Sequence, residues 1–268
     1  MAVQRNWDMG VISKTKSLLL STAGDDYSRA RLLAVSSPHA GDWLNASPIT
    51  AVGLKMTNEV IRVAAGLRLG AILCTPHICP CGCPVDARGS HGLSCSRSAG
   101  RQPRHSLLND IIYRSLIRAN IATMKEPTGL LPGTGLRPDG ATITPWVSGK
   151  CLAWDATTPD TLAASHLSAT SHSAGAAAAH AAALKDHKYS ALTTHYFIPV
   201  AVETLGPWNP DGLQFIKELG RRIALVTEDP REIAFILQKI SVAVQMGNAA
   251  SFEGSLPITR EDDPLDIV

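Results

Sequence analysis

Several features that are common in proteins are scarce or missing here, and each shortage excludes a class of protein. Aromatic residues make up only 5% of the 268 residues although hydrophobic residues make up 45%, so the apolar content is mostly aliphatic. Such a composition suits helices and buried strands rather than a disordered chain. No stretch approaches the roughly 20 uninterrupted apolar residues of a membrane-spanning helix, and residues 1–8 lead into no apolar signal core. We therefore expect a folded intracellular protein, nuclear or cytoplasmic, with no membrane partner.

Cysteines are also few, and their spacing is wrong for a set of disulfides. Three of the six, Cys79, Cys81 and Cys83, lie within five residues, which is too crowded for ordinary bridges. Cys79 and Cys81 are followed by His91 and Cys95, so three thiolates and one imidazole make up the ligand set of a tetrahedral zinc ion. We predict that Cys79, Cys81, His91 and Cys95 form a small zinc knuckle.

The exact set of zinc ligands stays open from the sequence alone. One residue separates Cys79 from Cys81, whereas common zinc fingers have about two to four between paired cysteines. The residues that are able to substitute are Cys74, His77, Cys83 and His105. The simplest alternative is a loop of reduced thiols without a metal ion. However, a loop rich in Pro and Gly cannot easily bury several thiols without an organising centre.

Positive charge is concentrated directly after the cysteines, although the formal net charge is only +2. Residues 87–119 contain six arginines and one acid, Asp110. Arginine suits phosphate groups, and its attraction to them needs no particular base sequence. We therefore predict nucleic-acid contacts by five basic residues, namely Arg97, Arg101, Arg104, His105 and Arg137. The C-terminal tail has the opposite charge, and we expect it to be solvated and flexible; it contains Glu261, Asp262, Asp263 and Asp266.

Apolar periodicity predicts a mixed α/β fold with the order αβββαβ at its centre. This core consists of a helix at 103–119, strands near 121–126, 137–145 and 150–157, an alanine-rich helix at 173–192 and a strand at 197–202. Further helices are expected at 13–35, 57–69, 211–225 and 229–246. The Gly-Asp-Asp sequence at 24–26 is interpreted as a helix cap or a turn.

These elements divide the chain into five parts. The expected parts are a helical lead-in segment (1–73), a zinc knuckle (74–102), an αβββαβ core (103–208), C-terminal covering helices (209–250) and an acidic flexible tail (251–268). The chemistry is expected in the core, directly after the knuckle.

Two acids stand on strands that a tight turn joins. Asp139 opens the second expected strand and Asp155 lies on the third. Their carboxylates are then able to share a hard divalent cation, and Mg²⁺ is the natural candidate where a phosphate is the other ligand. Glu126, at the end of the preceding strand, would supply a third oxygen. The simpler alternative makes Asp139 a turn residue and Asp155 a strand-end cap.

A pair of lysines on the alanine-rich helix completes the candidate site. Lys185 and Lys188 are three positions apart and share a helix face, from which an ammonium group reaches the same strand ends. Metal-held water, a lysine that orients it or stabilises charge, and carboxylates on adjacent strands are the components for hydrolysing a phosphodiester. A solvated helix surface is the usual alternative for a lysine pair.

Pro138-Asp139 followed by Asp155, within an αβββαβ order, resembles the restriction-endonuclease-like PD-(D/E)XK nucleases. The chain departs from that family at Thr157, where a lysine usually stands two places after the second acid. It is similar to one branch in particular, the endonuclease domain that ends the polyproteins of early-branching non-LTR retrotransposons. In that branch the lysine has moved to the following helix and a Cys/His knuckle precedes the nuclease. The resemblance covers residues 67–206.

This resemblance implies a metal-dependent endonuclease with a structural Zn²⁺ and a catalytic Mg²⁺. Asp139 and Asp155 would be metal ligands, Lys185 or Lys188 the catalytic lysine, and Glu126 an auxiliary acid. In the family the nuclease nicks target DNA, and the freed 3′ end primes reverse transcription of the element's RNA, so DNA and that RNA are the implied partners. The family's polymerase lies upstream of the knuckle. Only about 70 residues precede the knuckle here, so we expect a fragment or a separated terminal region.

Two other functions compete with the nuclease. A catalytically inactive nucleic-acid-binding remnant or repurposed module would keep the knuckle and the basic helix, and Thr157 favours it. A purely structural zinc module that tethers another protein is the third hypothesis.

Overall fold

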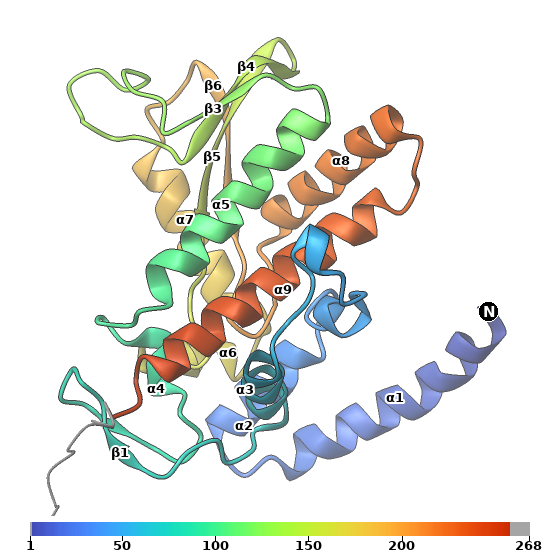
Figure 1. The fold of residues 1–268 in the computed structure, drawn as a ribbon, viewed down its shortest axis with the longest axis vertical. Coiled ribbons are helices and arrows are strands. Elements are labelled where there is room, and N and C mark those ends of the chain that lie inside the picture. Colours follow the sequence, from blue (N-terminus) through green and yellow to red (C-terminus); the bar gives the residue numbers. More distant parts are fainter. Residues whose placement is uncertain (1, 258–268) are drawn as a thin grey trace, which may run out of the picture.

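A computed structural model describes residues 2–257 and shows a mixed α/β protein built on a four-stranded mixed sheet (Figure 1). The strand order is β3-β4-β5-β6, and the strands are β3 (Thr123–Lys125), β4 (Gly140–Val147), β5 (Lys150–Thr157) and β6 (His195–Ala201). The first three strands pair antiparallel, whereas β6 pairs parallel with β5. A parallel pair needs a crossover, and here it runs through α6 (Ala164–Thr170) and α7 (Ala176–Lys188).

The other elements surround this sheet at both ends of the chain. They are α1 (Ala2–Thr22), α2 (Asp26–Val35), the 3-10 helices η1 (Asp42–Asn45) and η2 (Thr50–Val52), α3 (Asn58–Leu69), the strands β1 (His77–Ile78) and β2 (Pro84–Val85), α4 (His91–Ser94), α5 (Arg101–Arg118), α8 (Pro210–Thr227) and α9 (Glu232–Glu253). The predicted order of helix, three strands, helix and strand is confirmed by α5, β3, β4, β5, α7 and β6, and α6 is an element that the sequence analysis missed.

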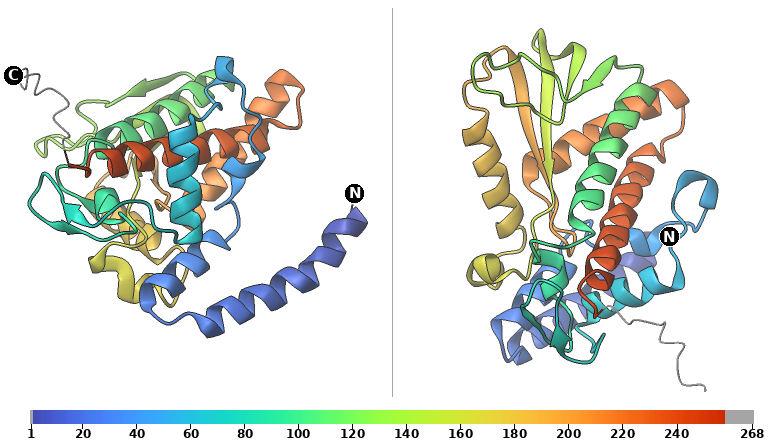
Figure 2. Two further views of the ribbon diagram at one scale, coloured as in Figure 1. Left: turned by 60° about the horizontal axis from the view of Figure 1, so that its bottom comes forward. Right: turned by 60° about the vertical axis from the view of Figure 1, so that its left-hand side comes forward.

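Side chains alternate across β5 and so place its residues on opposite faces of the sheet. Leu152 and Trp154 lie in the main core together with α5, α8 and α9. Ala153 instead packs beside Tyr189, at the end of α7. Figure 2 shows α7 on one side of the sheet and α5, α8 and α9 on the other. The alternation therefore turns Asp155 toward α7, the helix that carries the two lysines.

Helix α9 is a central element rather than the outer cover that we predicted. It contacts α5 and α8 of the core, α3 and η1 of the N-terminal part, and α4 of the knuckle region. By length and composition it passes as a possible membrane span, but 61% of that window is buried inside the protein, as in an ordinary core helix. The helix continues to Glu253, so residues 251–253 do not belong to a flexible tail. The acidic residues 261–266 lie outside the described residues.

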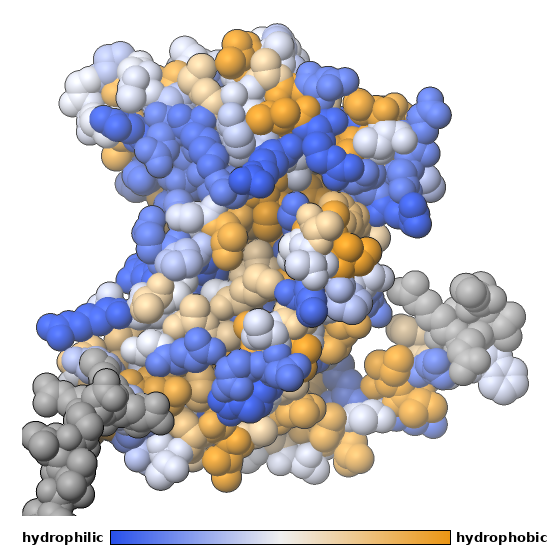
Figure 3. Space-filling model, in the orientation of Figure 1, coloured by the Kyte–Doolittle hydropathy of each residue, from blue (hydrophilic) through white to orange (hydrophobic). Residues whose placement is uncertain are grey.

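The N-terminal part begins with two helices where one continuous helical stretch, 13–35, was expected. Asp25 ends that continuity because its carboxylate accepts a hydrogen bond from the Ser28 N–H at 2.6 Å and so caps α2. The interpretation of residues 24–26 as a helix cap is confirmed. Helix α1 extends away from the body (Figure 1), and apolar side chains over it appear as an orange group at the lower right of Figure 3. Large hydrophobic residues of this helix that are exposed include Trp7, Ile12 and Leu18.

Glycines hold the cysteine-rich segment tightly against α9. A Cβ on Gly92 would lie 2.6 Å from the Ser251 carbonyl oxygen, and one on Gly100 would lie 2.3 Å from the Gly247 carbonyl oxygen. Real Cβ atoms cannot approach backbone so closely, so only glycine permits this packing. The segment is thereby fixed to the same helix that forms the wall of the core.

Candidate metal centres

The cysteine-rich segment forms a small hairpin followed by a short helix. Strands β1 and β2 pair antiparallel, and the turn between them is closed by the Cys79 N–H, which donates to the Cys83 carbonyl at 2.9 Å. Gly82, with φ of 92°, provides the left-handed residue that this turn needs. The turn carries Cys79 and Cys81. Helix α4 begins at His91 and is capped by Cys95, so its two ends carry the other two residues.

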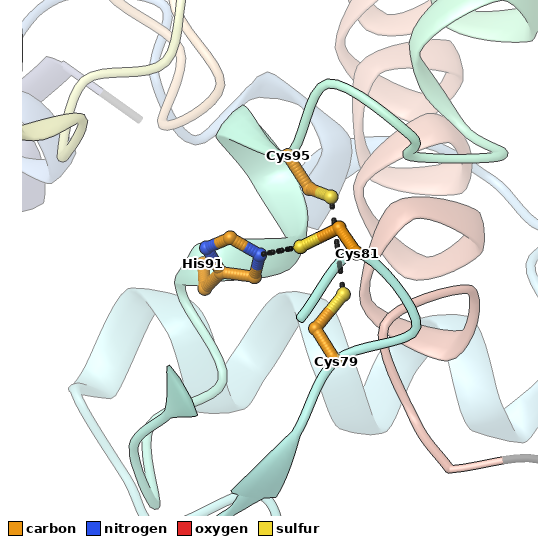
Figure 4. A group of neighbouring side chains, drawn as sticks. All are labelled: Cys79, Cys81, His91 and Cys95. Atoms are coloured by element: carbon orange, nitrogen blue, oxygen red, sulfur yellow. Dashed lines mark hydrogen bonds between the residues drawn. The ribbon is translucent and has the colours of Figure 1, made fainter. Parts of the chain in front are cut away.

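These four side chains converge as the sequence predicted (Figure 4). One ligand atom from each of Cys79, Cys81, His91 and Cys95 lies within 4.8 Å of the others. The Cys79 and Cys95 sulfurs are 3.8 Å apart, and the Cys81 sulfur is 3.2 Å from His91 Nε2. With Zn–S bonds of about 2.3 Å, the edge of a tetrahedron between two sulfurs is about 3.8 Å. The cluster is therefore able to bind a metal ion such as zinc.

The two cysteines of the turn have opposite electrostatic surroundings. Burial raises the pKa of the Cys79 thiol to about 11, because a thiolate is poorly solvated there. The backbone N–H of Cys83 stabilises the Cys81 thiolate and lowers its pKa to about 6. One thiolate is thus ready to receive a cation, whereas the buried thiol needs the cation itself to lose its proton.

The four substitute ligands considered in the sequence analysis lie outside this cluster. Cys74 donates instead to the Asp86 carbonyl at 3.4 Å, and His77 Nε2 lies 2.9 Å from the Ser255 carbonyl oxygen. Cys83 is exposed to solvent. His105 belongs to a second group of side chains, together with Asp139 and Asp155. The four residues predicted as ligands are therefore the ones that converge, and none of the four substitutes belongs to their cluster.

The second group joins His105 to the two predicted aspartates. His105 comes from α5, Asp139 directly precedes β4, and Asp155 lies on β5. Their ligand atoms lie within 4.8 Å of one another. The antiparallel register explains the meeting of the acids. Gly140 pairs with Trp154, so Asp139, which precedes Gly140, and Asp155, which follows Trp154, lie at the same end of the strand pair. Of the three side chains, Asp155 is the most buried, with 4% of its surface exposed.

Asp139 is held in place by hydrogen bonds from three elements. Its Oδ2 accepts from the Ala156 N–H of β5 at 2.6 Å and lies 3.0 Å from His105 Nε2. Its carbonyl accepts from Asn109 Nδ2 of α5 at 3.2 Å and from the Glu126 N–H at 3.1 Å. The hydrogen bond to the carboxylate raises the pKa of the His105 imidazole. The Asp139 carboxylate is thus held by contacts from both β5 and α5.

The lysines of α7 reach Asp155 from the other side. Lys185 Nζ lies 2.5 Å from Asp155 Oδ1, and Lys188 Nζ lies 3.7 Å from Asp155 Oδ2. Tyr189 follows them and donates its hydroxyl proton to the Arg137 carbonyl at 2.6 Å. The end of α7 is therefore tied to the segment that carries Asp139. Both predicted lysines belong to the site, and Lys185 makes the shorter contact.

The start of α7 is fixed by a buried carboxylate that the sequence analysis did not single out. Glu203, with none of its surface exposed, accepts hydrogen bonds from the N–H groups of Ala177 at 3.0 Å and Ala178 at 3.1 Å. Thr161 donates to its other oxygen at 2.9 Å. A carboxylate suits this place because the N-terminus of a helix attracts negative charge.

We expect Glu203→Ala to lower the free energy of unfolding by about 1–3 kcal/mol, since it leaves two buried N–H groups without a partner. Glu203→Gln keeps one acceptor oxygen for these groups, so its loss should be smaller. Urea unfolding followed by circular dichroism measures both. If the Ala variant were as stable as wild type, the carboxylate would not be the anchor of α7.

A cleft lies between helix α4 of the knuckle region and the side chains of His105 and Lys185. Its volume is about 600 Å³, and α4, α5, α6, α7 and the end of β5 form its walls. Its lining includes Leu93, Ser94, Arg101, His105, Thr157 and Lys185. Thr157, from the end of β5, and Lys185, from α7, line the same cleft.

Two predicted site residues lie elsewhere. Glu126 is exposed, and only its backbone touches the site, so its carboxylate does not join the group of His105, Asp139 and Asp155. Its φ of 46° turns the chain out of β3 immediately after the strand. The prediction of Glu126 as a third metal ligand is therefore wrong for this arrangement.

Arg104 also differs from the prediction of a nucleic-acid contact. Its side chain is only 3% exposed and donates to Asn248 Oδ1 at 2.8 Å and to the Leu93 carbonyl at 3.1 Å. It thus joins α5 to α9 and α4 inside the protein. Arg97, Arg101 and Arg137 are exposed, as a contact surface requires.

Two residues that position the site escaped the sequence analysis, Asn109 and Glu203. Asn109 also accepts a hydrogen bond from the Trp154 indole at 2.8 Å, so it links α5 to both acid-bearing segments. For Asn109 the available signal was a polar residue within an apolar helix face. No family model matches the chain, and no curated protein matches it either.

Proposed function

We propose that the protein is a metal-dependent DNA endonuclease of the restriction-endonuclease-like type, related to the nuclease region of non-LTR retrotransposon polyproteins. The single observation that carries the proposal is the meeting of Asp139, Asp155 and Lys185 beside His105, although these residues come from four separate elements. Two acids and a lysine often lie together on a protein surface by chance. It less readily produces a group in which the acids are largely buried and each is held by hydrogen bonds from a different element.

The residues present fit a divalent cation. Two carboxylates provide the hard oxygen ligands, and an ion such as Mg²⁺ bound there would act as a Lewis acid on a phosphate and acidify a bound water molecule. The ammonium group of Lys185 would stabilise the negative charge that develops on the phosphate during hydrolysis. Lys188 lies farther from Asp155 and contributes positive charge to the same region.

The rest of the structure suits a nucleic-acid substrate. The αβββαβ order and the mixed sheet are those expected for the nuclease family. Helix α4 of the knuckle region borders the same cleft as the candidate active site. Arg101, which lines this cleft, and Arg97, in the knuckle region, are exposed. Arginines on the approach to a carboxylate site offset its negative charge and attract phosphate groups. In this proposal the knuckle and the start of α5 hold the DNA while Asp139 and Asp155 act on one strand.

Nicking of supercoiled plasmid tests the proposal. We expect the zinc-loaded protein to convert plasmid to nicked circles in the presence of Mg²⁺ and to stop when EDTA is added. Lys185→Met should slow nicking by about 10- to 100-fold, and Lys188→Met should slow it less, because removing a charge-stabilising group costs most where that group is closest. Lys55→Met, which changes an exposed lysine outside both groups, is the control. Nicking that is unaffected by Lys185→Met would contradict the assigned role.

A non-catalytic nucleic-acid-binding module is the second candidate. Thr157 favours it. The ion pair between Lys185 and Asp155 also favours it, because each charged group already has the other as its partner. The same assay separates the two functions. A remnant would bind DNA through the knuckle region but leave the plasmid supercoiled at every metal concentration.

A further inference from the structure

The imidazole of His105 lies where a third metal ligand would stand. It projects from α5, on the opposite face of the sheet from α7, and meets the two carboxylates at the sheet's end. Nε2 is 3.0 Å from Asp139 Oδ2, and the ligand atoms of His105, Asp139 and Asp155 all lie within 4.8 Å of one another. The His105 side chain is 34% exposed, so it has room to adjust.

We infer that His105 is a direct ligand of the ion in this group, and that the site therefore favours a first-row transition ion such as Mn²⁺ over Mg²⁺. That the bound ion takes part in DNA cleavage rests on the proposed function. That His105 binds the ion does not. It assigns to His105 a role different from the nucleic-acid contact that the sequence suggested.

The geometry needs only a small adjustment. Two ligands with bonds of about 2.1 Å to one ion cannot be more than about 4.2 Å apart. The present limit of 4.8 Å thus requires a shift of less than about 1 Å. Asp139 is anchored by the Ala156 N–H and by Asn109, so the partly exposed imidazole is the group that moves.

The chemistry of the ligands sets the preference. Mg²⁺ takes oxygen ligands almost exclusively and keeps several water molecules, whereas an imidazole nitrogen suits transition ions. One nitrogen and two carboxylates thus form a mixed set, in contrast to the sulfur-rich knuckle. Thiolates retain Zn²⁺, so Mn²⁺ added to the zinc-loaded protein should leave the knuckle occupied and report on the second group.

Electron paramagnetic resonance of Mn²⁺ tests this assignment directly. Titration of zinc-loaded protein with Mn²⁺ alone gives the affinity, because only free Mn²⁺ shows the strong six-line signal. Pulsed measurements on the bound ion reveal coupling to a coordinated ¹⁴N nucleus. We expect this coupling in the wild type and its loss in His105→Asp, and we expect His105→Ala to weaken Mn²⁺ binding at least about tenfold.

His105→Asp provides a test in which a change of metal preference is expected, and not only weaker binding of Mn²⁺. It replaces nitrogen by oxygen in a half-buried position, so it should raise the affinity for Mg²⁺ relative to Mn²⁺, measured by competition. His180→Ala is the matched control, because His180 lines the same cleft but lies outside the group. It should change neither the affinity nor the nitrogen coupling.

The outcomes separate this inference from the proposed function. Bound Mn²⁺ without nitrogen coupling in the wild type, or equal Mn²⁺ affinity in wild type and His105→Ala, overturns the inference even if the protein nicks DNA. Nitrogen coupling that disappears in His105→Asp supports it even if no nicking occurs under any condition. An absence of Mn²⁺ binding at millimolar concentration also overturns it.

Discussion

Replacing Asp155 by Asn should abolish plasmid nicking while the protein stays folded. The Asp155 carboxylate would bind the candidate ion and also pairs with Lys185, and its side chain is only 4% exposed. Asn keeps the shape but not the charge, so it would bind a divalent cation far more weakly. We expect nicking to fall by at least about 10²- to 10³-fold, the loss that follows removal of one preorganised charged group in an enzyme.

The fold should tolerate this change because the partners of Asp155 reach water. Losing one member of a buried ion pair is costly when the remaining charge cannot be solvated. Here the side chains of Lys185 and Lys188 are 25% and 40% exposed, so both ammonium groups can turn to solvent. The substitution also relieves repulsion between the carboxylates of Asp139 and Asp155. The melting temperature should therefore change little.

Asp186→Asn is the matched control for this prediction. Asp186 is an exposed acid on α7, next to Lys185 in sequence but outside the group of ligands. The control should nick at the wild-type rate. Undiminished nicking by Asp155→Asn would remove Asp155 from the active site, and a fall of many degrees in its melting temperature would mean that its role is structural.

The order of elements was predictable from the sequence because each element of the core has a strong local signal. Alternating and continuous apolar runs mark β4, β5 and β6, and the alanine-rich stretch marks α7. The errors fall where tertiary packing decides. Helix α9 was predicted to cover the core from outside because it follows the last strand, but its contacts with α3, α4, α5 and α8 place it at the centre of the protein. Its high apolar content was the available signal, because a helix that is hydrophobic on all sides is a buried one.

The acids of the site were predictable from strand pairing, but the imidazole was not. Asp139 and Asp155 meet because a short turn joins β4 and β5, which spacing alone indicates. His105 reaches them because α5 packs against the sheet, whereas its place beside several arginines in the sequence suggested a basic surface. Arg104 was assigned to that same surface, although it is turned into the protein toward Asn248. Adjacent residues on a helix point in different directions, and only packing shows which of them faces inward.

Loss of one knuckle cysteine should have the largest effect on stability. Cys95 is 4% exposed, and its sulfur lies 3.8 Å from that of Cys79. A structural zinc ion contributes roughly 10 kcal/mol or more to the folding of a small zinc domain at neutral pH. Cys95→Ser should therefore bind far less than one equivalent of zinc and should unfold at a much lower temperature. Zinc content by mass spectrometry and thermal unfolding by calorimetry measure the two effects.

The damage should spread beyond the knuckle because of the way in which it packs. Leu93, on the helix between His91 and Cys95, lies in a core cluster with residues of α2, α3 and α9. When the metal no longer holds α4, that cluster loses one of its walls, and the start of α5 loses its support. Cys83→Ser is the control, because Cys83 belongs to the same turn but is exposed and lies outside the cluster. If Cys83→Ser lost the zinc ion and Cys95→Ser kept it, the ligand set would be wrong.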